Sequence, residues 1–273
     1  MAKFDGILIC TDLDGTLLKE DKTVSEENKQ AIEYFKQEGG KFTFITGRMP
    51  FFVSQIIEAV HPNAPFGCVN GGGLYDAEQN EYVWTLPMPD GVAELIRTVD
   101  KTMPDVGFQV NTFQNVYFSK YNITMRDFRI RNHLPDITCP YDAPPEPIAK
   151  IVFGAETEPE IQALEKLLRT HPKAENFDFI RSEEKLFEIL PKGSGKGRAI
   201  ENLCNYLHID KSKTIAVGDY NNDIAMFHAA GMGIAVENAC KEALDAADFI
   251  TVSNENHAIA RVIADLEQEK FSM

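Results

Sequence analysis

The chain has 273 residues, 44% hydrophobic and 25% charged, which are proportions of a globular protein and exclude collagen-like, disordered and low-complexity classes. Its formal net charge of −15 would repel a phosphate backbone, so we expect no nucleic acid partner. No run approaches the ~18 apolar residues of a membrane span, and no signal peptide precedes the first apolar run, so we expect no membrane partner and a cytoplasmic location.

The first 85 residues alternate between predicted strands and predicted helices. The predicted strands are residues 6–10, 41–45 and 66–70. The predicted helices are residues 25–38 and 50–60. Thr23 or Ser25 suits the N-cap of the first helix, and Gly39 suits its stop. Alternation of this kind is typical of a doubly wound, mostly parallel α/β sheet.

The same alternation returns from about residue 214. The predicted strands are residues 214–217, 233–236 and 249–252. The predicted helices are residues 222–230 and 239–246, with a last one after Asn256. The two ends of the chain are therefore expected to form one Rossmann-like α/β core, made of residues 1–85 and 190–273.

The middle of the chain, residues 86–189, has a different pattern. Strands are predicted within 107–118 and at 148–153, a hairpin at 177–190 and a helix at 158–171. A proline-rich turn lies at 140–147. This mixture predicts an inserted α+β domain with an antiparallel sheet.

Two carboxylates stand directly after the first predicted strand. Asp12 and Asp14 belong to the pentapeptide Asp-Leu-Asp-Gly-Thr, which follows the apolar run at 7–10. Ligands of parallel sheets gather at the carboxyl ends of the strands, so these side chains are candidate site residues. By itself the pentapeptide also fits an Asx turn closed by Gly15.

A third carboxylate follows a distant strand of the same predicted sheet. Asp219 lies in Gly-Asp-Tyr-Asn-Asn-Asp, directly after residues 214–217. The carboxyl ends of parallel strands share one edge of the sheet, which would bring Asp219 to Asp12 and Asp14. Three such oxygen ligands, completed by water and a phosphate, are what Mg²⁺ usually takes, so we predict a Mg²⁺ site.

Anion-binding groups are predicted near the same edge. After the second strand, Thr46 offers a hydroxyl, Gly47 an open backbone N–H and Arg48 a guanidinium suited to phosphate. Lys196, between glycines before a predicted helix, could reach an anion there. Each of these signals is weak alone, since Thr46 also suits a helix N-cap and both basic residues suit a solvated surface.

Taken together and in order, these motifs resemble those of the haloacid dehalogenase superfamily of phosphatases. They are Asp12-Leu13-Asp14-Gly15-Thr16, Thr46-Gly47-Arg48, Lys196 and Gly218-Asp219-x-x-Asn222-Asp223. The insertion, with Asn70-Gly71-Gly72 before it and Glu188-Ile189-Leu190-Pro191 leading to Lys196, looks like the large α/β substrate-specificity cap of Cof-type members.

The resemblance implies a role for each matching residue. Asp12 would attack phosphorus to form an aspartyl-phosphate and bind Mg²⁺, and Asp14 would act as general acid and base, its backbone carbonyl on the metal. Asp219 would also ligate Mg²⁺. The residues that would hold the phosphoryl oxygens are Leu13 through its backbone amide, Thr46, Gly47, Lys196, Asn222 and, as an aid, Arg48. Asp223 would lie in the second shell of the metal or orient Lys196.

The implied activity is Mg²⁺-dependent hydrolysis of small phosphorylated metabolites, sugar phosphates among them. As an acid, Asp14 needs a pKa above that of Asp12, which a less polar environment would provide. A phosphomutase of the same superfamily is one alternative. A receiver-like module that holds a phospho-aspartate as a signal is another, although the large insertion disfavours it. The sequence leaves the substrate and the oligomeric state open.

Overall fold

The computed structural model describes residues 2–270 and divides into two compact units. The discontinuous unit holds the chain up to Thr85 and again from Gly195, and the inserted unit holds Leu86–Ser194. The sequence placed the second boundary at residue 190. The structure places it after Ser194, because the last inserted strand runs to Pro191 and the Ser194 N–H donates to the Pro191 carbonyl at 3.0 Å.

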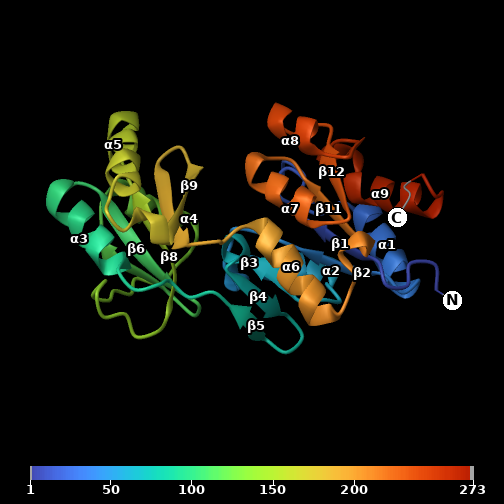
Figure 1. The fold of residues 1–273 in the computed structure, drawn as a ribbon, viewed down its shortest axis with the longest axis horizontal. Helices are drawn as coiled ribbons and strands as arrows, with labels where there is room; N and C mark the ends of the chain where they lie inside the picture. Colours follow the sequence, from blue (N-terminus) through green and yellow to red (C-terminus); the bar gives the residue numbers. More distant parts are fainter. Residues whose placement is uncertain (1, 271–273) are drawn as a thin grey trace. The chain divides into compact units, whose positions relative to one another are not determined.

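A five-stranded parallel sheet forms the centre of the discontinuous unit, as expected for a doubly wound α/β fold (Figure 1). Its order is β13-β12-β11-β1-β2. The strands are β1 (Leu8–Thr11), β2 (Lys41–Phe44), β11 (Thr214–Gly218), β12 (Met232–Val236) and β13 (Phe249–Thr251). All four residues of β1 are buried, and β1 pairs with β11 on one side and β2 on the other.

Helices cover both faces of this sheet. They are α1 (Glu26–Gln37), α2 (Ser54–Val60), α6 (Lys196–Leu207), α7 (Ile224–Ala229), α8 (Lys241–Ala246) and α9 (Ala258–Glu267). Leu8 and Cys10 of β1 belong to the buried cluster that also holds side chains of α6, α7 and α8. The helices α1 and α9 pack together, and the Asn28 side chain accepts a hydrogen bond from the Ala260 N–H at 2.9 Å.

The region 66–85 differs from the predicted continuation of the parallel sheet. Here β3 (Phe66–Cys68), β4 (Gly73–Asp76) and β5 (Glu81–Thr85) form a separate antiparallel sheet, and a single Ile45–Gly67 bridge connects β3 alongside β2. Val69, Asn70 and Gly71 all have positive φ, between 52° and 82°. This left-handed turn sends the chain back along β3 into β4, so the α-helix of a βα unit does not follow that strand.

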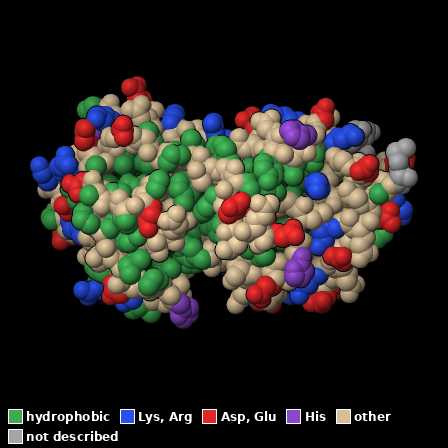
Figure 2. Space-filling view, turned by 90° about the horizontal axis from the view of Figure 1, so that it is seen from below, with side chains coloured by type: hydrophobic (Ala, Val, Ile, Leu, Met, Phe, Trp, Pro, Cys, Tyr) green, Lys and Arg blue, Asp and Glu red, His purple; other side chains and the backbone are tan. Residues whose placement is uncertain are grey.

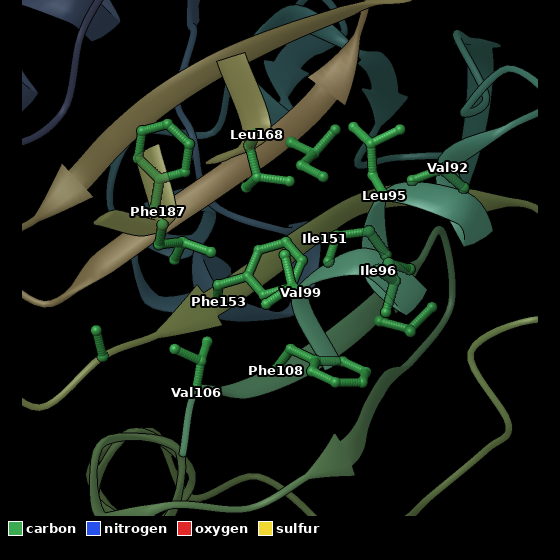
Figure 3. Close-up of a cluster of buried hydrophobic side chains, with 14 of the residues drawn as sticks. Val92, Leu95, Ile96, Val99, Val106, Phe108, Ile151, Phe153, Leu168 and Phe187 are labelled. Atoms are coloured by element: carbon green, nitrogen blue, oxygen red, sulfur yellow. The ribbon is translucent and has the colours of Figure 1, made fainter. Parts of the chain in front are cut away.

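The inserted unit is an α+β fold with an antiparallel sheet of order β7-β6-β8-β10-β9. Its strands are β6 (Gly107–Thr112), β7 (Val116–Lys120), β8 (Ile148–Gly154), β9 (Phe177–Glu183) and β10 (Leu186–Pro191). Its helices are α3 (Val92–Thr102), α4 (Ile123–Arg131) and α5 (Glu158–Arg169). The helix α3 was not predicted; it buries Val92, Leu95, Ile96 and Val99 against the sheet (Figure 3).

Charged side chains of both signs are scattered over the face seen in Figure 2, and no continuous basic surface is visible there among the described residues. In the part of the chain that the structure describes, no helix has the length and apolar character needed to span a membrane.

A buried ion pair crosses the inserted sheet on the side opposite its apolar core. Lys150 Nζ on β8 lies 2.8 Å from Glu188 Oε2 on β10, and the two side chains are 9% and 6% exposed. Beside them on β6, Gln109 and Asn111 are also buried. A buried pair adds little net stability, but removing one partner leaves an uncompensated charge in a poorly solvated place.

We therefore expect Lys150→Met to lower the free energy of unfolding by about 3–5 kcal/mol, measured by urea titration. Lys192→Met removes a lysine of the exposed Lys192–Asp178 pair in the same unit and should cost only about 0–1 kcal/mol. The double variant Lys150→Met with Glu188→Met should recover most of the loss. Equal effects of the two single lysine variants would contradict the assigned importance of this pair.

Candidate active site

The strand order brings two acidic strand ends and a third that carries a threonine to one place. Asp12 directly follows β1, and Asp219 directly follows the neighbouring β11. The Asp12 N–H donates to the Val217 carbonyl at 2.8 Å, which continues the pairing of the two strands. Thr46 lies just beyond β2, on the other side of β1. Residues about 200 positions apart in the sequence therefore meet at one edge, as parallel-sheet topology predicts.

A buried lysine joins two of the carboxylates. Lys196 Nζ lies 2.7 Å from Asp12 Oδ1 and 2.5 Å from Asp223 Oδ1. Lys196 is the first residue of α6, and Asp223 immediately precedes α7. The two helix starts approach closely because Gly197 has no side chain: a Cβ there would lie 2.4 Å from the Ala225 carbonyl oxygen. Packing of α6 on α7 thus delivers the lysine to the acidic strand ends.

Asp223 is a supporting carboxylate and is fully buried. Its Oδ2 accepts hydrogen bonds from the backbone N–H groups of Asp219 at 2.9 Å and Tyr220 at 3.0 Å. With Oδ1 on Lys196, both of its oxygens are bonded. These bonds fix the turn that carries Asp219, and the predicted function of Asp223 in orienting Lys196 stays a prediction.

Asp219 is held from the opposite side by the turn after Asp12. Thr16 Oγ1 donates to Asp219 Oδ1 at 2.9 Å. Gly15 lies beside the same carboxylate with φ +79°, and a Cβ there would be 2.5 Å from Asp219 Oδ2. Both the left-handed backbone and the close approach require glycine at this position.

Burial and neighbouring carboxylates raise the pKa values of Asp12 and Asp219. Burial raises the pKa of Asp12 to about 7, with the charges of Asp223 and Asp219 adding to the shift and Lys196 opposing it. Burial, followed by the charge of Asp223, raises the pKa of Asp219 to about 6. Burial would lower the pKa of Lys196, but Asp12 and Asp223 outweigh burial and raise it, so this lysine carries its charge.

The surroundings of Asp14 differ from the expectation that its pKa lies above that of Asp12. Both of its carboxylate oxygens contact Arg48 Nη2, at 2.7 and 2.6 Å, and Oδ1 accepts from Lys22 Nζ at 2.9 Å. Burial would raise the pKa of Asp14, but Arg48 and then Lys22 outweigh burial and hold the pKa below its usual value. The expected order of the two pKa values is therefore reversed here, because burial outweighs Lys196 at Asp12, whereas Arg48 and Lys22 outweigh burial at Asp14.

The remaining predicted residues border this cluster. Thr46 is buried, and its Oγ1 accepts the Arg48 N–H at 3.2 Å; Gly47 lies between them. The Arg48 guanidinium lies on the Asp14 carboxylate, and its predicted aid in holding phosphate stays a prediction. Leu13 is buried beside Asp12 and Asn222 is exposed beside Asp223; their predicted contacts with phosphate stay predictions.

The carboxylates fit a divalent cation. Oxygen atoms of Asp12, Asp219 and Asp223 lie within 4.8 Å of one another. Such oxygens suit Mg²⁺, whose charge would offset the burial and the neighbouring carboxylates that raise the pKa of Asp12 and of Asp219. The predicted set was Asp12, Asp14 and Asp219. The Asp14 carboxylate lies on Arg48 and Lys22, outside this group, so its predicted contact through the backbone carbonyl stays a prediction.

Three residues in contact with the site had no predicted role in it. Thr16 was seen only as part of the turn, although a hydroxyl beside two carboxylates was a usable signal. The Asn70 N–H donates to the Thr46 carbonyl at 3.1 Å, and its position before two glycines was the available signal. No sequence pattern indicated Lys22, because only the folded loop brings its side chain to Asp14.

Comparison with known proteins gives consistent matches over nearly the whole chain. The sequence profile of haloacid dehalogenase-like hydrolases matches residues 9–263. The chain is similar to the putative phosphatase YxeH of Bacillus subtilis, with 28% identity over 95% of this chain and 97% of the relative. It is also similar to 5-amino-6-(5-phospho-D-ribitylamino)uracil phosphatase YwtE of the same organism, with 27% identity over 97% of this chain and 99% of the relative.

The fold has a solved counterpart as well. The crystal structure of a haloacid dehalogenase-like hydrolase from Bacteroides thetaiotaomicron superposes with a TM-score of 0.84, covering 95% of this chain and 99% of that one. Its sequence identity is 22%, so this likeness establishes the fold.

The raised pKa of Asp12 predicts a pH-dependent stability. Its folded pKa of about 7 lies above the ordinary value of 3.8, so its contribution is present below pH ~4 and is lost as the pH rises through ~7. In EDTA, the unfolding free energy of the wild type minus that of Asp12→Asn should fall by roughly 2–4 kcal/mol over this range. The control Asp142→Asn, at an exposed residue, should give a free-energy difference that does not change with pH. A pH-independent difference for Asp12→Asn would contradict the raised pKa of Asp12.

Proposed function

This chain belongs to the family of haloacid dehalogenase-like hydrolases and is a phosphatase, and we propose that it hydrolyses small phosphomonoesters with Mg²⁺ through an aspartyl-phosphate. The observation that carries this proposal is the buried contact of Asp12 with Lys196 at the strand edge, where Asp219 also lies. It combines a carboxylate nucleophile, a fixed positive charge and oxygen ligands for a cation.

Asp12 is the proposed nucleophile. Its carboxylate would attack phosphorus, forming the O–P bond of an aspartyl-phosphate as the bond to the leaving oxygen breaks. Water would then hydrolyse this intermediate and release phosphate. The position of Asp12 favours this step, because a buried carboxylate is poorly solvated and Lys196 holds one of its oxygens.

Asp14 is the proposed proton carrier. As an anion held by Arg48 and Lys22, it is in the form that accepts a proton from the attacking water in the second half of the reaction. The first half needs a protonated Asp14 to neutralise the leaving oxygen. An incoming phosphate would compete for Arg48, which would free Asp14 and raise its pKa. This exchange reconciles the predicted phosphate contact of Arg48 with its observed contact to Asp14.

We infer that the phosphoryl oxygens are held by groups that follow the strands of the parallel sheet and by Lys196. These groups are the Leu13 and Gly47 backbone amides, the Thr46 hydroxyl, the Lys196 ammonium and the Asn222 side chain. Asp12 and Asp219 would hold Mg²⁺, together with the Asp14 carbonyl, whereas Asp223 already has both oxygens bonded. The cation would supply positive charge to offset the charge of the phosphate and of its ligands.

The proposed substrates are phosphorylated sugars and related polyols. YwtE, at 27% identity, is named for a phosphorylated ribityl compound, which is a polyol phosphate. The proposed assignment of the inserted unit is that of a substrate-specificity cap. A phosphomutase would return an isomerised phosphate ester, so the release of free phosphate separates hydrolysis from that alternative.

We expect Asp12→Asn to abolish hydrolysis of p-nitrophenyl phosphate, because an amide cannot attack phosphorus. Circular dichroism should show an unchanged fold. The control Asp142→Asn, in an exposed turn of the inserted unit, should hydrolyse the ester like the wild type. Residual turnover of Asp12→Asn near the wild-type rate would refute the assignment of the nucleophile.

We further expect phosphate release from a panel of sugar and polyol phosphates to stop in EDTA and to return on adding excess Mg²⁺, because the carboxylates then regain their cation. Malachite green detection measures this directly. Full activity in EDTA would refute the Mg²⁺ assignment. Activity restricted to esters without hydroxyl groups would refute the substrate class while leaving the mechanism intact.

A further inference from the structure

Two asparagines far along the chain hold the loop that follows the first strand. The Asn238 side chain donates from Nδ2 to the Gly15 carbonyl at 2.8 Å. The Asn254 side chain donates from Nδ2 to the Leu18 carbonyl at 2.9 Å, and Asn254 is only 6% exposed. Neither residue belongs to any motif of the proposed reaction, yet both hydrogen bonds lie on the loop that carries Asp14.

The two asparagines are also bonded to each other. The backbone N–H of Asn254 donates to Asn238 Oδ1 at 3.0 Å. The carboxamide of Asn238 therefore uses its oxygen toward Asn254 and its nitrogen toward Gly15. An amide is suited to this bridge because it both accepts and donates, whereas a carboxylate only accepts. The pair ties the turns at 237–240 and 253–256 to the loop at two carbonyls.

This bridge leads to the proposed metal ligand by two routes. The Gly15 carbonyl is part of the Gly15–Thr16 peptide plane, so fixing it sets the direction of Thr16, whose Oγ1 donates to Asp219 Oδ1. The second route runs through the loop of Asn238 itself, since the Cys240 N–H donates to the Asp219 carbonyl at 2.9 Å. One short loop thus fixes the backbone of Asp219 and the hydroxyl that orients its side chain.

We propose that Asn238 and Asn254 are positioning residues that pre-organise Asp219 and the Gly15–Thr16 turn for Mg²⁺ binding. This inference rests on the proposed function, since it requires that Asp219 binds the cation. Neither asparagine would touch the cation or the substrate. Partners behind metal ligands typically change metal affinity or activity by about 10–100-fold when they are removed.

The experiment measures Mg²⁺ binding to the full-length chain by isothermal titration calorimetry, without substrate. Asn238→Asp keeps the oxygen that accepts from Asn254 and loses the donor to Gly15. Asn254→Ala loses the donor to Leu18. We expect each variant to raise the Kd for Mg²⁺ about 10-fold or more relative to the wild type.

A matched control separates positioning from general stability. Asn63 also bridges two backbone groups, accepting the Phe42 N–H at 2.8 Å and donating to the Gly40 carbonyl at 3.0 Å. It lies at the amino end of β2, the opposite end from Thr46. Asn63→Ala should lower the urea midpoint of unfolding, as Asn254→Ala does, while leaving the Kd for Mg²⁺ at the wild-type value.

A double variant tests the route through Thr16. Thr16→Val removes the hydrogen bond to Asp219. The double variant Thr16→Val with Asn238→Asp should have a Kd for Mg²⁺ no higher than that of the single variant with the higher Kd. Residues that act in series give such non-additive effects. If the Kd of the double variant rises by the product of the two single-variant factors, this route is excluded.

The outcomes distinguish the positioning role of the asparagines from the proposed function. If the wild type binds Mg²⁺ and releases phosphate but both asparagine variants keep the wild-type Kd, the positioning role is overturned and the proposed function stands. An equal rise in Kd for Asn63→Ala would overturn it as well. A wild type that binds no Mg²⁺ in this assay would overturn both the positioning role and the Mg²⁺ assignment.

Discussion

The arrangement of the site depends on one buried ammonium group among crowded carboxylates. Lys196 contacts Asp12 and Asp223 at the end of the central strands, and its charge lets two carboxylates share a poorly solvated space. Burial, followed by the neighbouring carboxylates, outweighs the charge of the lysine, so the pKa values of Asp12 and Asp219 remain raised. A divalent cation suits this edge of the sheet, because its positive charge would stabilise the ionised carboxylates.

The backbone around this group is fixed by contacts that are individually ordinary. Gly197 lets α6 approach α7, and the N–H groups of Asp219 and Tyr220 hold Asp223 in place. On the other side, the loop after β1 is anchored through Asn238 and Asn254. Pre-organisation of this kind means that few groups have to reorganise when charge develops during phosphoryl transfer.

Much of the parallel sheet and of the site could be predicted, because the sequence patterns that indicate them are local. The apolar run of β1 and the alternation of strands and helices gave the parallel sheet, and the strand-end rule then placed Asp12, Asp219 and Thr46 together. The sheet of β3, β4 and β5 was not predicted, because consecutive positive φ values at Val69 and Asn70 are unusual for such residues. The helix α3 was missed, although its apolar positions, Val92, Leu95, Ile96 and Val99, are spaced as a helix requires.

The sequence by itself determined the fold class, the order of the motifs and the chemical identity of the groups at the strand edge, because these follow from periodicity and connectivity. Only the tertiary structure decided which charges meet. Arg48 and Lys22 lie on Asp14, and Lys196 lies between Asp12 and Asp223. A pKa is set by burial and by neighbours a few ångströms away in space, so the order of the Asp12 and Asp14 pKa values could not be deduced from residues adjacent only in sequence.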